Sequence, residues 1–155
     1  MKQTPSFRRI ALALLAATLC ASAVPAFART ISATAGSAMI GTNNGDFHAP
    51  GGIVYNSASL VRQWVMPIVF DNIGQRTIRV RGRVSTTGAM SCQAIAIATN
   101  GTTASVSATV AFPANNQWTS ISLTLSSVPA GATGSVGCSL TGPSSAALLG
   151  LDYLP

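Results

Sequence analysis

The chain has 155 residues, and the 8% of them that are charged make up about a third of the fraction in an ordinary soluble domain. It contains three aspartates, no glutamate and one histidine, against nine basic residues. Acid–base catalysis uses histidine or paired carboxylates, so this inventory argues against an enzyme, and no motif indicates a cofactor.

Residues 1–28 have the three parts of an export signal: basic residues first, an apolar run over residues 10–20, and small residues ending in Ala26-Phe27-Ala28. We therefore expect a secreted or periplasmic protein whose single domain spans residues 29–155. The apolar run is too short to cross a bilayer, and we expect no transmembrane segment elsewhere. The mature domain has six arginines and three aspartates, a net charge of about +3.

Two cysteines, Cys92 and Cys138, remain in the mature domain. No Cys or His lies at metal-ligand spacing from either of them, so we expect a structural disulfide between them and no metal site. The loop that it closes has about 45 residues, for which the loop-entropy model gives a stabilisation of about 4 kcal/mol.

The first half of the mature domain consists of short apolar segments separated by turn residues. We expect one weak strand within residues 31–40 and a short strand end at Ile53-Val54-Tyr55. Residues 60–70 are apolar at both parities, which predicts a central strand covered on both faces, or a strand followed by a buried extended segment. Pro67 cannot donate a ladder hydrogen bond, so we expect a bulge or a sheet edge there.

The segment Arg76–Val84 alternates arginine with apolar residues. Successive side chains of a strand point to opposite faces, so this pattern predicts a strand with one basic and one apolar face. The basic face contains Arg79, Arg81 and Arg83. Gly82 interrupts the apolar face, which predicts either a large side chain packed into the gap or a β-bulge.

The second half of the chain continues the pattern of short strands. A strand over residues 90–99 is expected to end at Asn100-Gly101, the dipeptide best suited to a type I′ hairpin. Residues 104–112 then place Val106 on an apolar face and Ser105 and Ser107 on a hydroxyl face. Later segments are expected to turn two apolar triplets inward and to close the chain at residues 148–154. The triplets are Ile121, Leu123 and Leu125, and then Val136, Cys138 and Leu140.

Seven or eight such strands at about ten-residue spacing are typical of an antiparallel β-sandwich. We expect an all-β fold, either jelly-roll or immunoglobulin-like.

Several short segments across most of the mature domain carry a resemblance. These are Gly52-Ile53-Val54-Tyr55-Asn56-Ser57, Val65-Met66-Pro67-Ile68-Val69, Cys92 and Gly137-Cys138-Ser139-Leu140. They resemble a group of small secreted bacterial proteins, single all-β domains of no assigned function, in which a Gly-x-Val-x-Asn segment precedes a Cys-Pro-Ile/Leu-Val segment. Late segments such as residues 136–140 are also similar to jelly-roll carbohydrate-binding modules.

This chain departs from the group at Met66, where the group has a cysteine. The partner cysteine near residues 37–39 is missing too. A pair of flexible thioethers can fill the space of a disulfide. The resemblance therefore implies that Met39 and Met66 are neighbours in the core.

The candidate ligand-binding residues are Arg79, Arg81 and Arg83. Guanidinium groups about 6.6 Å apart along a strand match rows of carboxylate or phosphate and suit an acidic polysaccharide, a lipid headgroup or nucleic acid. The alternative is a solvated sheet face, or a charged edge that prevents aggregation.

Trp118 is the fourth candidate, because it shares the parity of the hydroxyl residues Ser120, Ser122 and Thr124. An exposed indole on such a face stacks on a sugar ring, whereas the alternative is an indole that caps the end of the sandwich. Trp64 is expected in the core. The segment Asp46-Phe47-His48 is expected to be a polar turn, since one carboxylate is a poor start for a calcium site.

We therefore expect an exported, non-enzymatic β-sandwich that binds an anionic glycan or another polyanion. Its partner is an anionic polysaccharide or a lipid headgroup, with no specific recognition of nucleic acid. The alternative is a structural, subunit-type protein that assembles through exposed strand edges.

Overall fold

The computed structural model describes residues 28–39 and 46–153, without the side chain of His48. The expected export signal lies outside the described residues, except for Ala28. Within the described part of the chain, no helix is long and apolar enough to cross a membrane.

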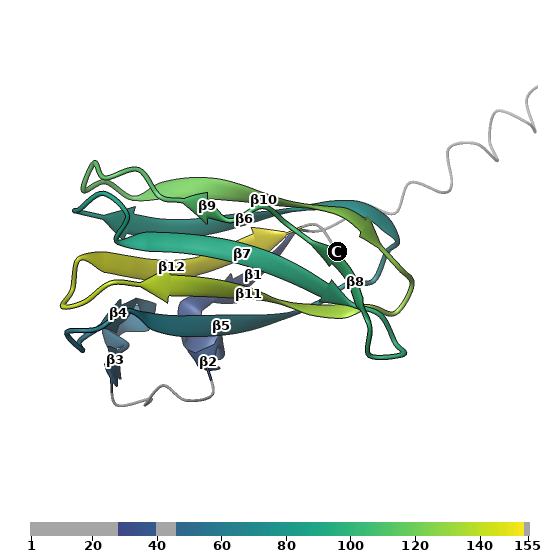
Figure 1. Ribbon diagram of the computed structural model, residues 1–155, viewed down its shortest axis with the longest axis horizontal. Helices are drawn as coiled ribbons and strands as arrows, with labels where there is room; N and C mark the ends of the chain where they lie inside the picture. Colours follow the sequence, from purple (N-terminus) through teal and green to yellow (C-terminus); the bar gives the residue numbers. More distant parts are fainter. Residues whose placement is uncertain (1–27, 40–45, 154–155) are drawn as a thin grey trace, which may run out of the picture.

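Two antiparallel sheets pack face to face, with their long strands along the same axis (Figure 1). Sheet A has the order β10-β6-β12-β4-β3, and β1 pairs with β12 beyond the end of β4. Its strands are β1 (Arg29–Ser32), β3 (Phe47–His48), β4 (Val54–Asn56), β6 (Gly74–Val84), β10 (Thr119–Val128) and β12 (Ala146–Tyr153).

Sheet B has the order β2-β5-β11-β7-β8, and β9 also pairs with β7. Its strands are β2 (Ser37–Ala38), β5 (Arg62–Val69), β7 (Met90–Ile97), β8 (Thr103–Val106), β9 (Val110–Ala111) and β11 (Thr133–Leu140). Two short 3-10 helices, η1 (Ala33–Ala35) and η3 (Pro50–Gly52), complete the described elements. The predicted all-β sandwich is confirmed, with more short strands than the seven or eight expected.

The core lies between the sheets and is built from the inward parity of each long strand. Both predicted inward triplets, on β10 and β11, are buried as expected. The largest fully buried side chains are Phe70, Met66, Ile68, Ile78, Met90, Leu123, Leu125, Leu140, Leu148, Leu151, Val54 and Val80.

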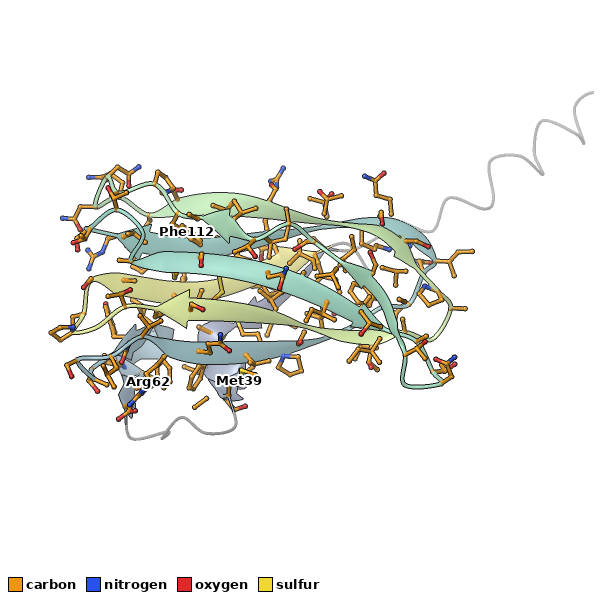
Figure 2. All side chains as sticks on the ribbon, viewed as in Figure 1. Met39, Arg62 and Phe112 are labelled. Atoms are coloured by element: carbon orange, nitrogen blue, oxygen red, sulfur yellow. A yellow bond between two sulfur atoms is a disulfide. The ribbon has the colours of Figure 1, made fainter. Side chains whose placement is uncertain are left out.

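Gly82 leaves a gap in the apolar face of β6, and side chains from across the core fill it. A Cβ atom at Gly82 would lie 2.3 Å from Cε of Met90, 2.9 Å from the carbonyl oxygen of Ala147 and 3.2 Å from Cε1 of Phe112. Figure 2 shows Phe112 beside β9, next to β6. The pairing of β6 with β10 is unbroken from Arg76 to Gly82, so the arginines keep one parity and the packing prediction is correct. The register with β12 does shift opposite Gly82 and Arg81, between Leu148 and Gly150, so the irregularity predicted at Gly82 lies on the partner strand and not on β6.

The predicted disulfide joins Cys92 on β7 to Cys138 on β11. The two residues are direct partners in the antiparallel register of these strands, with their Cα atoms 4.1 Å apart. Both cysteines are buried, so the bridge fastens the middle of sheet B from its core side.

The predicted faces of β8 are reversed in the structure. Ser105 and Ser107 are buried, whereas Val106 is 48% exposed. Each serine hydroxyl accepts a hydrogen bond from a backbone N–H of another strand: Ser105 Oγ accepts from Ser126 N at 3.1 Å, and Ser107 Oγ accepts from Ala94 N at 2.9 Å. Burial of these hydroxyls costs little because they are hydrogen-bonded.

The segment of residues 60–70 is neither a strand covered on both faces nor a strand followed by a buried extended segment, the two structures expected. On β5, Trp64, Met66 and Ile68 are buried, but Val69 is 52% exposed, so the strand has one open face. Its free edge begins near Pro67, as predicted, because β2 pairs only with Trp64 and Val65.

The predicted contact between Met39 and Met66 in the core is wrong. Met39 is 49% exposed, and Figure 2 shows its side chain beside β2 at the margin of the sandwich, whereas Met66 is fully buried. Gly36 is the residue of this segment that lies against Met66, since a Cβ there would be 3.1 Å from Met66 Cγ. The strand expected over residues 31–40 is broken at the same place by η1, which separates β1 from β2.

The hairpin at Asn100-Gly101 forms with a different turn from the one expected. Gly101 has φ +83°, but Asn100 is not among the described residues with positive φ, which a type I′ turn requires. Gly101 N donates to Ala98 O and Ala98 N donates to Thr102 O, both at 2.9 Å. This is the pattern of a three-residue loop with glycine at the bulge position.

Candidate functional site

The predicted arginine face is the outer face of sheet A. Arg79, Arg81 and Arg83 alternate with buried residues along β6. Because β6 pairs with β10 on one side and with β12 on the other, these arginines stand on the strand next to the edge strand β10 and not on the edge itself. The interpretation of the row as a charged sheet edge is therefore wrong.

Hydroxyl groups of β10 border the arginine row. In the register of the two strands, Ser120 is opposite Arg81 and Ser122 is opposite Arg79, and directly opposite residues share a face. Both serines are exposed. The face therefore offers neutral hydrogen-bonding groups next to its cations.

Trp118 lies on the same face, immediately before β10, and contacts Arg83. The Cζ atom of Arg83 is 5.4 Å from the centroid of the indole ring, a separation typical of a cation–π contact worth about 0.5–1 kcal/mol at an exposed site. Trp118 is 45% exposed, so it does not cap the core. The contact holds a planar cation and an aromatic ring together at one end of the row.

Arg81 differs from its two neighbours because it is paired with Asp152 of β12. Its Nη2 donates to Asp152 Oδ1 at 3.2 Å, and its Nε lies 3.2 Å from Oδ2 without the alignment of a hydrogen bond. Thr30 Oγ1 donates to Asp152 Oδ1 at 2.7 Å. The carboxylate is thus held in place from β1 as well as from β6.

Arg79 lines a hollow of about 420 Å³ together with Thr77, Asp152 and Tyr153. Asp152 is its direct partner in the register, although the carboxylate is bonded to Arg81. Within the described residues, neither Arg79 nor Arg83 forms an ion pair.

Each of the three aspartates forms an ion pair with an arginine. Asp71 pairs with Arg29, Asp46 pairs with Arg62 at 2.5 Å, and Asp152 pairs with Arg81. In the described part of the chain, the arginines left without a carboxylate are Arg76, Arg79 and Arg83, and all of them lie on β6. The excess positive charge of the domain is therefore concentrated on one strand.

Tyr55 joins the site, although no sequence motif pointed to it. The register places Tyr55 opposite Ala147 of β12, and Ala147 opposite Arg83. Tyr55 is partly exposed, and the line from it to Trp118 crosses three strand spacings, about 14 Å. Only the long-range pairing of β4 with β12 brings it to this face.

The other candidates have structural roles. Trp64 is buried, and its Nε1 donates to Ala33 O at 2.8 Å, as expected for a core residue. The segment Asp46-Phe47-His48 is not the polar turn expected: Asp46 pairs with Arg62, but Phe47 and His48 form β3, and the Phe47 ring lies 4.7 Å from the Trp64 ring. Among the residues that the structure describes, no three His, Cys, Asp or Glu side chains are grouped to hold a metal ion.

The outer face of sheet B has a hollow of about 390 Å³ over β11. Gly137 lies there between Ser135 and Ser139, and none of the lining residues is charged. The two outer faces of the sandwich therefore differ in charge, and sheet A is the face suited to an anion.

No family model matches the chain, and no curated protein matches it. The chain is similar in structure to the C-terminal CBM6 of LamC, a laminarinase from the marine organism Zobellia galactanivorans. That match has a TM-score of 0.57 and 19% identity and covers 83% of this chain and 100% of the module. It is also similar to a CBM35 from Paenibacillus barcinonensis, with a TM-score of 0.51 and 11% identity over 83% of this chain and 98% of that one.

These likenesses define the class of fold: a β-sandwich of the kind seen in CBM6 and CBM35 carbohydrate-binding modules. The predicted similarity to jelly-roll modules is confirmed at the level of the fold. Membership of the group of small secreted bacterial proteins stays a prediction. The fold and the disulfide are consistent with an extracytoplasmic protein.

Proposed function

We propose that this protein is an exported, non-enzymatic module that binds acidic polysaccharide on the outer face of sheet A. The observation that carries the proposal is the contact between Trp118 and Arg83 at the end of a row of arginines on an inner strand of sheet A. The similarity of the fold to carbohydrate-binding modules supports it.

Each group on the face has a role in binding such a ligand. The indole of Trp118 packs against the apolar side of a sugar ring. The guanidinium groups of Arg79 and Arg83 bind carboxylate or sulfate with two parallel hydrogen bonds. The hydroxyls of Ser120 and Ser122 replace hydrogen bonds that the sugar hydroxyls lose on leaving water. A long, linear glycan makes these contacts at the same time, and a small anion does not.

A lipid headgroup is the weaker partner. Peripheral membrane binding needs a large apolar surface as well as cations, and Trp118 is the large apolar side chain that this face exposes. Vesicles of anionic lipid therefore belong in the test as a competing ligand.

The alternative of assembly through strand edges is disfavoured at two of the edges that the sheets expose, those of β5 and β10. On β5, Pro67 has no N–H to donate, and the Tyr153 hydroxyl accepts from Val69 N at 3.4 Å and donates to Val69 O at 3.0 Å. On β10, the N–H of Ser126 is bonded to the Ser105 hydroxyl. An added strand finds these groups occupied.

Export is part of the proposal. Removal of residues 1–28 leaves a domain that begins with β1 at Arg29, and the Cys92–Cys138 bridge is suited to an oxidising compartment. N-terminal sequencing of the protein recovered after export tests the cleavage position.

The experiment is affinity electrophoresis of the mature domain in gels that contain polygalacturonate, dextran sulfate or neutral laminarin, beside sedimentation with anionic vesicles. We expect retardation by the acidic polysaccharides that decreases with salt, and its loss in Trp118→Ala and in Arg83→Ala. Arg76→Ala is the matched control, because Arg76 lies on the same strand but donates to the carbonyls of Ile73 and Gln75. Equal retardation of all variants, or none by either acidic polysaccharide, would overturn the proposal.

A further inference from the structure

Asp152 divides the arginine row into two separate anion sites, and we propose that it thereby selects the kind of acidic glycan that binds. The inference rests on the proposed function and names its ligand class. The preferred glycan carries acidic groups that are separated by neutral units, and an uninterrupted row of anionic units is discriminated against.

The division follows from the contacts of the middle arginine. Asp152 approaches Arg81 with both carboxylate oxygens at 3.2 Å. The Nε and Nη2 side of the guanidinium therefore faces Asp152, and the charge of Arg81 is already balanced by that carboxylate. The hydrogen bond from Thr30 at 2.7 Å keeps Asp152 in this position, so a ligand has to break two contacts to displace it.

The outer two arginines are not neutralised in this way. Arg83 lies with its Cζ over the Trp118 ring, a contact that leaves its charge without a carboxylate partner and its N–H groups able to bind an anion. Arg79 borders the hollow next to Thr77. The two are four positions apart along β6, a distance of about 13 Å between their Cα atoms.

A ligand that spans this distance meets three positions in order: a cation at Arg83, a neutral ion pair at Arg81 and a cation at Arg79. An anionic unit over the middle position gains nothing from Arg81 and is repelled by the carboxylate of Asp152, which is 30% exposed. A neutral sugar at this position has hydroxyls that both members of the pair can hydrogen-bond. The face therefore favours glycans with interspersed charge.

Asp152→Asn is the decisive variant. It keeps the size of the side chain and an oxygen that accepts from Thr30, but it releases Arg81 and removes the repulsion. We expect affinity for polygalacturonate and for dextran sulfate, which are densely charged with carboxylate and sulfate respectively, to rise about two- to fivefold, the range that one exposed charge pair supports. For hyaluronan, in which acidic and neutral units alternate, we expect less than half of that gain.

Asp46→Asn is the matched control, since it changes the net charge equally and releases Arg62 of β5, an arginine of the other sheet. We expect it to leave all three affinities within about 1.5-fold, because the freed charge is away from the face and screened by salt. Isothermal titration with oligosaccharides of equal length gives the affinities, and circular dichroism checks the fold. Asp152→Ser serves the same purpose if Asp152→Asn does not fold.

The outcomes separate the inference from the function on which it rests. If the wild type binds acidic glycans through Trp118 and Arg83 but Asp152→Asn gains nothing on polygalacturonate, the inference is wrong and the proposed function stands. An equal gain on hyaluronan and polygalacturonate also overturns the selectivity. If the wild type binds none of the three glycans, both proposals fail.

Discussion

Replacement of Asn56 by alanine is expected to destabilise the domain by about 3 kcal/mol. Asn56 belongs to the Gly-x-Val-x-Asn segment and is fully buried. Its Nδ2 donates to the carbonyl oxygens of Leu60 and Leu140, each at 2.7 Å, and its Oδ1 accepts from Ala58 N at 2.9 Å. Alanine leaves two carbonyls and one N–H without partners, and each such group costs about 1–3 kcal/mol, with carbonyls at the low end.

Urea unfolding followed by tryptophan fluorescence measures this loss, which corresponds to a decrease in Tm of about 10 °C for a domain of this size. The dependence of the unfolding free energy on urea should not change. Asn56→Asp should be worse than Asn56→Ala, because a carboxylate oxygen would face two carbonyl oxygens. Asn115 is the control: it accepts from Gln117 N in an exposed turn, and Asn115→Ala should cost less than about 0.5 kcal/mol. A loss below about 1 kcal/mol in Asn56→Ala would refute the reasoning.

Two further predictions concern glycine and the disulfide. Gly82→Ala should lower the unfolding free energy by about 1–3 kcal/mol, because its Cβ would lie 2.9 Å from a backbone carbonyl that cannot move aside. Gly137→Ala is the control: its Cβ meets nothing within 4 Å, so the unfolding free energy should change by less than about 0.5 kcal/mol in the same assay. Similar losses in both variants would contradict the packing argument. Cys92→Ala with Cys138→Ala should lower the unfolding free energy by about 4 kcal/mol, and a mass measurement without reductant that finds two free thiols in the exported wild type would exclude the bridge.

The parts of the fold that the sequence predicted correctly depend on local alternation. On β6, β10 and β11 the apolar residues repeat with period two, and the register preserves that parity along β11 and, on β10, as far as Leu125. The two-faced arginine strand and the inward position of Cys138 follow from this repeat alone. The disulfide was predictable because residues 29–155 contain only two cysteines.

The errors arise where a distant partner decides the side of a residue. Ser105 turns inward because the N–H of Ser126, on the other sheet, needs an acceptor. Met39 faces outward because the pairing of β2 with β5 places it beside Gln63, on the outer parity of β5, where Met39 N donates to Gln63 O at 3.0 Å. A window of a few residues contains neither partner, so composition assigned the serine to the surface and the methionine to the core.

The same limit explains which parts of the candidate site were predictable. The spacing of the three arginines along one strand was visible in the sequence, but the division of the row was not, because Asp152 is 71 residues away from Arg81. The net charge of about +3 was likewise visible in the sequence, but the place of that charge on the surface was not. Only the pairing of each aspartate with an arginine shows that the unmatched charge lies on β6.

The unpaired arginines on β6 matter because only 8% of the residues in this chain are charged. On an ordinary domain, with about a quarter of its residues charged, three unmatched arginines are lost among many neighbouring charges. In the described part of the chain the arginines outside β6 are paired with aspartates, so the unmatched arginine charge lies on β6. If the proposed function holds, Asp152, which pairs with the middle arginine of the row, is therefore the acidic side chain best placed to change the selectivity of this face.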